Sequence, residues 1–108
     1  MPAGDFKERR RYPRVKAAVP LELRHSAGAA PLRVTANEIS AGGCYIETMF
    51  TLDVGTRVAM VIWLDNEKIT AKGVVATRYP QVGNGIEIVQ ISPDDRAKLE
   101  AYLGKLRP

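Results

Sequence analysis

The sequence is poor in the residues from which several kinds of site are built. It contains one cysteine, Cys44, and one histidine, His25, among 108 residues. A single cysteine cannot form an internal disulfide, which is typical of a reducing cytoplasm, and these two residues cannot supply a Cys/His metal cluster. No apolar run approaches the roughly 20 residues that span a bilayer, and no secretory signal is apparent at the N-terminus. We therefore expect a cytoplasmic protein without membrane insertion.

Positive charge is concentrated at the N-terminus. The first 16 residues hold six of the 16 lysines and arginines but two of the 12 acidic residues, which accounts for the whole formal net charge of +4. The remaining residues carry equal numbers of bases and acids. Residues 1–14 are polar, and Pro13 biases the residue before it towards an extended backbone. We predict a flexible, arginine-rich arm over residues 1–14.

Residues 15–108 are expected to form one domain, because a chain of this length buries a real hydrophobic core. Apolar and polar residues alternate with a period of two, which is typical of strands. Strands are predicted within residues 15–24, 32–37, 44–47, 58–64, 68–79 and 86–91, with a turn at 82–85. Gly73, in the middle of a strand, favours a bulge that lets a sheet close. The pattern predicts an all-β fold, a six-stranded antiparallel β-barrel, with one helix.

That helix is predicted over residues 93–106, where the period changes. Ser92 is a candidate N-cap, Pro93 suits the first helical position, and Asp95 completes the spacing of a capping box. Apolar residues then recur at helical spacing, at Leu99, Tyr102, Leu103 and Leu106. The strand at 58–64 is apolar on both faces, which is typical of a strand covered on both sides. We expect the C-terminal helix to cover its outer face.

The sequence has no pattern typical of an enzyme. His25 lies beside a predicted loop without a nearby nucleophile, and the carboxylates lack the paired spacing used in acid–base chemistry. Cys44 is expected to be buried and inert, because a reactive thiol needs an electropositive, exposed setting. The glycines match neither a phosphate loop nor a dinucleotide fingerprint. We predict a binding protein with no cofactor and no catalytic or metal site.

The first candidate binding motif is the arginine cluster of the arm, formed by Arg9, Arg10, Arg11 and Arg14. In an extended segment, Arg10 and Arg14 point the same way about 13 Å apart. Guanidinium groups offer forked donors to phosphates and flat faces to purine rings. A solvated basic tail would explain the same stretch.

The second candidate motif spans residues 37–43, between two predicted strands. Asn37 and Ser40 supply short polar groups, while Gly42 and Gly43 allow backbone amides to approach a ligand closely. An ordinary turn closed by the Asn and Ser side chains would also fit.

Together, the two motifs resemble the signature of the PilZ domain, a family of bacterial receptors for the second messenger cyclic di-GMP. Arg10 and Arg14 are assigned to the arginine motif, and Asn37, Ser40 and Gly43 to the N-x-S-x-x-G turn. The resemblance extends to the barrel and the C-terminal helix, and so covers nearly the whole chain. It implies that the arginines contact guanine faces and phosphates while the turn holds a guanine edge and the phosphate backbone.

The resemblance also implies how the protein signals. Arg9, directly before the motif, favours an intercalated dimer of the ligand, and a rearranged surface would then engage an unidentified effector protein. Two alternatives remain open: single-stranded nucleic-acid binding and ligand-independent adaptor function. The first is disfavoured because the barrel is charge-neutral and lacks aromatics interleaved with bases. The second is disfavoured by the intact arginine motif.

Overall fold

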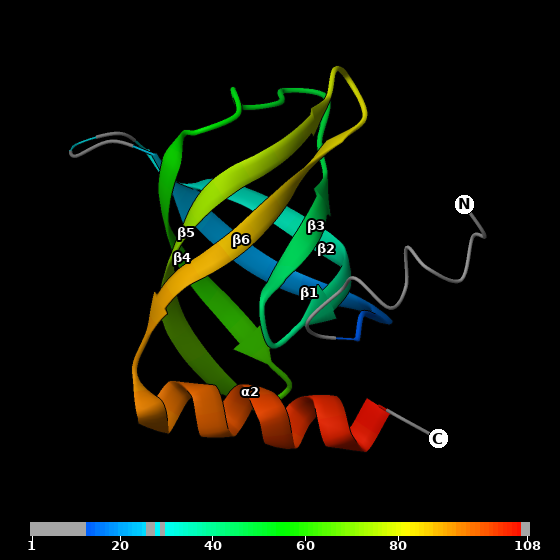
Figure 1. Ribbon diagram of the computed structural model, residues 1–108, viewed down its shortest axis with the longest axis vertical. Helices are drawn as coiled ribbons and strands as arrows, with labels where there is room; N and C mark the ends of the chain where they lie inside the picture. The colour runs from blue at the N-terminus through cyan, green and yellow to red at the C-terminus, as the bar shows by residue number, and fades with distance from the viewer. Residues whose placement is uncertain (1–12, 26–27, 29, 107–108) are drawn as a thin grey trace, which may run out of the picture.

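The computed structural model describes residues 13–25, 28 and 30–106, which form a closed antiparallel β-barrel followed by one helix (Figure 1). The elements are β1 (Val15–Arg24), β2 (Leu32–Ser40), β3 (Gly43–Glu47), β4 (Arg57–Leu64), β5 (Glu67–Tyr79), β6 (Gly83–Ile91) and α2 (Pro93–Leu106). The predicted six-stranded barrel and C-terminal helix are confirmed. The arginines at positions 9, 10 and 11 lie outside the described residues.

The strands follow the order β1-β2-β3-β6-β5-β4 around the barrel, and β4 pairs with β1 to close it. β3 pairs with β6 instead of β4, so the chain crosses from β3 to β4 through residues 48–56. Consequently β3 and β4 lie on opposite sides of the ring, three strands apart in either direction.

Alternate side chains of each strand point inward and fill the barrel. On β1, Val19, Leu21 and Leu23 are fully buried, as the period-two pattern predicts. The inward residues of the other strands complete one continuous core, including Ile39, Ile46, Met60, Ile62, Ile69, Val75 and Ile86. This core fixes the outward positions of the strands, where the candidate site lies.

Gly73 marks the place where β5 bends. The register between β5 and β6 shifts between Lys72 and Gly73, and a Cβ atom on Gly73 would lie 2.8 Å from the carbonyl oxygen of Glu87. A bulge at this glycine was predicted from the sequence and is confirmed. The missing side chain allows β6 to approach closely enough for the barrel to close.

The turn predicted at residues 82–85 is wrong. The chain reverses at residues 80–82, where Gln81 adopts a positive φ of 64°, and β6 already begins at Gly83. Asn84 is fully buried: its Oδ1 accepts from the Leu52 amide at 2.8 Å, and its Nδ2 donates to the carbonyls of Leu52 and Thr77 at 2.9 and 3.1 Å. Asn84 therefore holds the crossing segment against the barrel instead of forming a turn.

The start of α2 is capped as predicted, but a second contact was missed. The Ser92 hydroxyl accepts from the Asp95 amide at 3.1 Å, which is an N-cap bond. The Asp95 carboxylate does not complete a capping box. It accepts instead from the Thr70 amide at 3.1 Å, which ties the first turn of α2 to β5.

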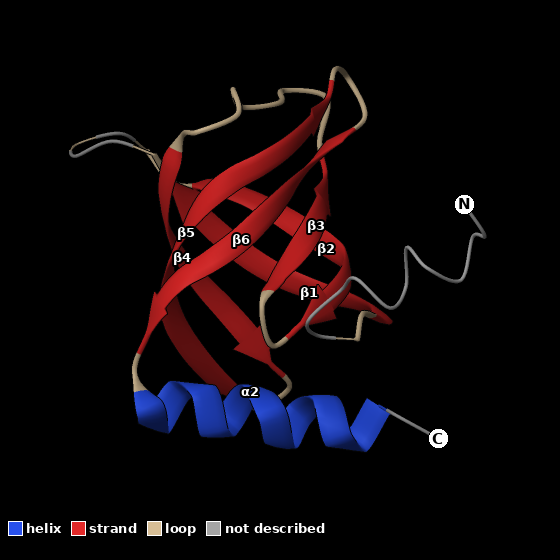
Figure 2. Cartoon of the chain, viewed as in Figure 1, coloured by secondary structure: helices blue, strands red, loops and turns tan. Residues whose placement is uncertain are grey.

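The predicted position of the helix is also wrong. Figure 2 shows α2 lying across one end of the barrel, where its buried residues Leu99, Tyr102 and Leu103 close the core. The outer face of β4 is left uncovered, so Ala59 is exposed and Trp63 is half-buried. Closing the barrel end buries apolar side chains of several strands at once, which covering one strand face would not do. Across the described residues, no helix has the length and apolar character needed to cross a membrane.

Candidate ligand-binding site

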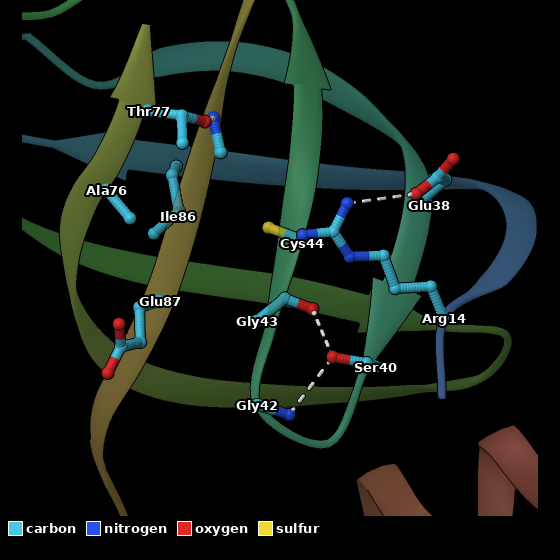
Figure 3. A pocket seen from close by; sticks show the side chains of 11 residues that line it. Arg14, Glu38, Ser40, Gly42, Gly43, Cys44, Ala76, Thr77, Ile86 and Glu87 are labelled. Carbon is cyan, nitrogen blue, oxygen red and sulfur yellow. Dashed lines mark hydrogen bonds and ion pairs between the residues drawn. The ribbon is translucent and has the colours of Figure 1, made fainter. Parts of the chain in front are cut away.

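The tight turn between β2 and β3 is the centre of the candidate site. The buried Ser40 hydroxyl accepts from the Gly42 amide at 3.1 Å and donates to the Gly43 carbonyl at 3.3 Å (Figure 3). Arg96 of α2 donates to the Ala41 carbonyl at 3.4 Å, which supports the turn from the helix side. The Ser40 side chain therefore has a structural role, since it closes the turn.

Gly43 is needed for the strands to pair. A Cβ atom on Gly43 would collide with the carbonyl oxygen of Ile86, and it would lie only 3.2 Å from the Cα of Glu87. These opposing atoms belong to the backbone of β6, so they cannot move aside like a flexible side chain. The sequence interpretation explained Gly43 by the close approach of a ligand. The structure adds a second explanation, which is that β6 packs too closely for a side chain at this position.

A cleft of about 250 Å³ opens beside this turn on the outer surface of β2, β3, β5 and β6. Arg14 reaches it from the segment before β1, and its guanidinium lies 3.5 Å from the Glu38 carboxylate (Figure 3). The lining consists of Arg14, Glu38, Ser40, Gly42, Gly43, Cys44, Ala76, Thr77, Gly85, Ile86 and Glu87. Four of the predicted site residues, Arg14, Ser40, Gly42 and Gly43, are thus brought together.

Asn37 is not part of this cleft. Its Nδ2 donates to the Glu47 carboxylate at 2.8 Å, and its Oδ1 is buried without a hydrogen-bond partner among the described residues. Two residues separate Asn37 from Ser40, whereas an N-x-S-x-x-G motif allows only one. The assignment of Asn37 to the first motif position is therefore wrong, and Glu38 occupies that position.

The charge of the cleft comes from three side chains. Arg14 is the only cation that lines it in the described part of the chain, while Glu38 and Glu87 contribute two carboxylates. Glu38 is paired with Arg14, whereas Glu87 makes no ion pair with a described residue. The described part of the cleft is therefore slightly negative.

Sequence reasoning missed the contribution of β5 and β6. The Gly85 amide donates to the Thr77 hydroxyl at 3.1 Å, and a Cβ atom on Gly85 would collide with that hydroxyl. Two cross-strand pairs, Gly43 with Glu87 and Tyr45 with Gly85, place this part of β6 directly beside the turn. The turn-like composition of residues 83–85 hid the strand, so no signal in that segment indicated the site.

Cys44 lies at the edge of the cleft but is unsuited to chemistry. The residue is buried, and desolvation raises the pKa of its thiol to about 12. A thiol with this pKa stays protonated near neutral pH and is a poor nucleophile. The prediction of a buried thiol is confirmed.

Comparisons with known proteins agree on the fold. The family model of the PilZ domain matches residues 8–105. The solved PilZ domain of YcgR from Escherichia coli with c-di-GMP has a TM-score of 0.74 and 18% identity, covering 91% of this chain and 91% of that chain. The Klebsiella pneumoniae MrkH–c-di-GMP complex has a TM-score of 0.76 and 20% identity, covering 91% of this chain and 51% of that one.

The Bacillus subtilis inhibitor of motility, MotI, is also similar. Its TM-score is 0.72 at 21% identity, with 92% of this chain covered and 54% of that chain. The chain therefore spans about half the length of MotI and MrkH. A comparison with curated protein sequences found no match.

Proposed function

Because the chain belongs to the PilZ domain family, we propose that it is a receptor for cyclic di-GMP that passes the signal to a separate effector protein. The observation that carries the proposal is the convergence of Arg14 and the Ser40–Gly43 turn on one surface cleft. The structures of YcgR and MrkH, which share the fold, were both solved with c-di-GMP.

The charge of the cleft favours participation of the arm. Cyclic di-GMP is a dianion, and the described part of the cleft offers it one cation against two carboxylates. Like charges within a few ångströms oppose binding, so the ligand needs further positive groups. Lys16 of β1, which pairs across the strands with Glu38, lies nearby, and the arm adds three further cations at Arg9, Arg10 and Arg11. We assign these three arginines with Arg14 to the phosphates and the guanine faces.

The size of the cleft leads to the same assignment. Pockets that enclose a small molecule measure about 300–1,000 Å³, whereas this cleft measures about 250 Å³. A dinucleotide would therefore be held only in part by the barrel. The arm would cover the remainder, and a second, intercalated ligand molecule stacked on the first would enlarge the surface that the arginines contact.

Glu38 is suited to reading a guanine base. The Watson–Crick edge of guanine presents two neighbouring N–H donors, which a carboxylate accepts through both oxygens. In this proposal Arg14 leaves Glu38 for a phosphate, and the freed carboxylate accepts from the base.

Calorimetric titration of the full chain with cyclic di-GMP tests the proposal. Each charge-assisted bond contributes about 1.5–3 kcal/mol, so Arg10→Ala and Arg14→Ala should each weaken binding by about tenfold or more. Arg33→Ala is the matched control, because that exposed arginine pairs with Glu22 away from the cleft. The titration also gives the stoichiometry, and two ligands per chain are expected.

Two results would contradict the proposal. Unchanged affinity for cyclic di-GMP in the Arg10 and Arg14 variants would show that these arginines do not contact the ligand. No heat of binding with wild-type protein, together with a salt-sensitive shift of random oligonucleotides, would favour a single-strand binder instead.

A further inference from the structure

The outer face of β4 is an apolar strip that no helix in the described chain covers, with Ala59 exposed and Val61 and Trp63 half-buried. Ala59, Val61 and Trp63 point outward along this strand, while their neighbours in sequence point into the core. Helix α2 lies across the end of the barrel and leaves this strip open (Figure 2). An uncovered strip that includes a tryptophan is typical of an interaction surface.

Three cations surround one end of this strip. Ala59 is paired across the strands with Arg24 of β1 on one side and with Lys72 of β5 on the other. Two strand spacings, about 10 Å, therefore separate these two positive residues. Arg57 lies two residues before Ala59 on the same face of β4, so the three cations form a triangle around an apolar centre.

The triangle borders a hollow whose lining combines basic and apolar residues with His25 and Gln90. The hollow measures about 590 Å³, and Arg24, Arg57 and Lys72 line it together with Ala59, Val74 and Val89. No carboxylate belongs to this lining, and none of the three cations forms an ion pair with another described residue. Val89 is 57% exposed, so apolar surface continues onto β6.

We propose that this surface, called here the β4 face and defined by Ala59, Val61 and Trp63 with Arg24, Arg57 and Lys72, docks an acidic segment of a partner protein. The unpaired cations are complementary to carboxylates, and the apolar strip is complementary to aliphatic or aromatic side chains. A protein segment supplies both kinds of group. A nucleic acid fits less well, because it needs a track of phosphate contacts with bases stacked on aromatic rings. The β4 face offers one compact basic cluster and one tryptophan, and the Glu22 carboxylate beside Val61 is already paired with Arg33.

The β4 face shares no residue with the lining of the proposed nucleotide cleft. β4 and β3 lie on opposite sides of the ring, but the hollow extends over β5 and β6, where Val74 of its lining pairs with Glu87 of the cleft. The peptide is therefore tested on the protein without cyclic di-GMP. A test without nucleotide keeps the two proposals separable.

Trp63 allows a direct test, because it is the only tryptophan of the chain and lies within the proposed surface. The probe is a short synthetic peptide in which glutamates alternate with leucines, titrated into the full chain without nucleotide. We expect its binding to shift Trp63 fluorescence in a saturable manner. Peptides with lysine for glutamate or serine for leucine should bind at least about tenfold more weakly.

Charge-reversal variants locate the contact. Arg24→Glu with Lys72→Glu should weaken peptide binding by about tenfold or more. Lys98→Glu with Lys105→Glu makes the same charge change on exposed positions of α2 and should leave binding unchanged. Circular dichroism melts of both double variants establish that the fold persists, and Ala59→Glu provides a second, single disruption of the same surface.

Four outcomes would overturn the proposal. The first is an equal loss of peptide binding in both double variants. The second is that the peptide with serine for leucine binds as tightly as the original peptide. Either result would mean that binding reflects nonspecific charge attraction. The third is a stronger Trp63 response to a single-stranded oligonucleotide than to the peptide, which would favour nucleic acid. The fourth is concentration-dependent sedimentation that Ala59→Glu abolishes, which would make a second copy of this chain the occupant.

Discussion

Gly43→Ala is the change for which the structure predicts the clearest loss of stability. The new methyl group would collide with the carbonyl oxygen of Ile86, and it would lie 3.1 Å from the carbonyl carbon. Both atoms belong to the backbone of β6, in the pairing that joins β3 to the rest of the barrel. Relief of the collision requires the two strands to separate, which weakens the cross-strand bonds around residues 43–47.

The size of the effect follows from this geometry. Overpacking usually costs about 1–3 kcal/mol, and a collision with backbone belongs at the upper end, about 3 kcal/mol. Unfolding entropy scales with chain length, so 1 kcal/mol corresponds to about 4 °C in Tm for a domain of this size. We therefore expect the Tm of Gly43→Ala to fall by about 12 °C in a thermal melt followed by circular dichroism.

Gly104→Ala is the matched control. A Cβ atom on Gly104 would meet nothing within 4 Å, and the residue lies in α2. Alanine is a better helix former than glycine, so this variant should gain up to about 1 kcal/mol. If Gly43→Ala melts at the wild-type Tm, the close approach of β6 is not the reason for a glycine at this position. Ligand contact would then be the remaining explanation.

Three further predictions follow from individual side chains. Asn84→Ala should lower the free energy of unfolding by about 3 kcal/mol in urea titration, because three hydrogen bonds of a fully buried amide are lost; a loss below about 1 kcal/mol would contradict this. The two carboxylates of the cleft should have opposite effects in calorimetry with cyclic di-GMP: Glu38→Gln weakens binding about tenfold by removing a charged acceptor, whereas Glu87→Gln tightens binding by removing a like charge from the cleft lining. Equal effects would refute the distinction. Because burial raises the pKa of Cys44 to about 12, its thiol should react with Ellman's reagent at pH 8 only after denaturation, and rapid labelling of the folded protein would show that it is exposed.

Local patterns predicted the elements of this fold well, because alternation and helical periodicity depend on neighbours in sequence. The strand of Val19, Leu21 and Leu23 and the N-cap at Ser92 are confirmed on this basis. Contacts between segments that are distant in sequence could not be predicted in the same way. Asn84, in a segment with the composition of a turn, is buried because its amide satisfies the backbone of a distant crossing segment.

The candidate site was predictable only in part for the same reason. Ser40 and Gly43 lie in one short motif, so they could be identified together from the sequence. Thr77 and Glu87 reach the cleft through strand pairing between β5, β6 and β3, which no local pattern encodes. The error at Asn37 has a different cause: the spacing to Ser40 was misassigned, and the structure places Glu38 in the cleft instead.

The first position of the turn motif is Glu38 and not Asn37, and this reassignment changes the charge that the arginine arm has to supply. With an amide at that position, the cleft would carry one cation and one carboxylate; with Glu38 it carries one cation and two carboxylates. A dianion approaching the barrel alone would then be repelled, and Arg14 is already engaged by Glu38 at 3.5 Å. Binding of a dianionic nucleotide therefore needs more positive charge than Arg14 supplies. The first 16 residues hold the entire excess of positive charge in this chain, and four of their six bases precede residue 12. On this argument the arm supplies the electrostatic attraction and the barrel supplies the shape and the base recognition, so neither part should bind the ligand without the other.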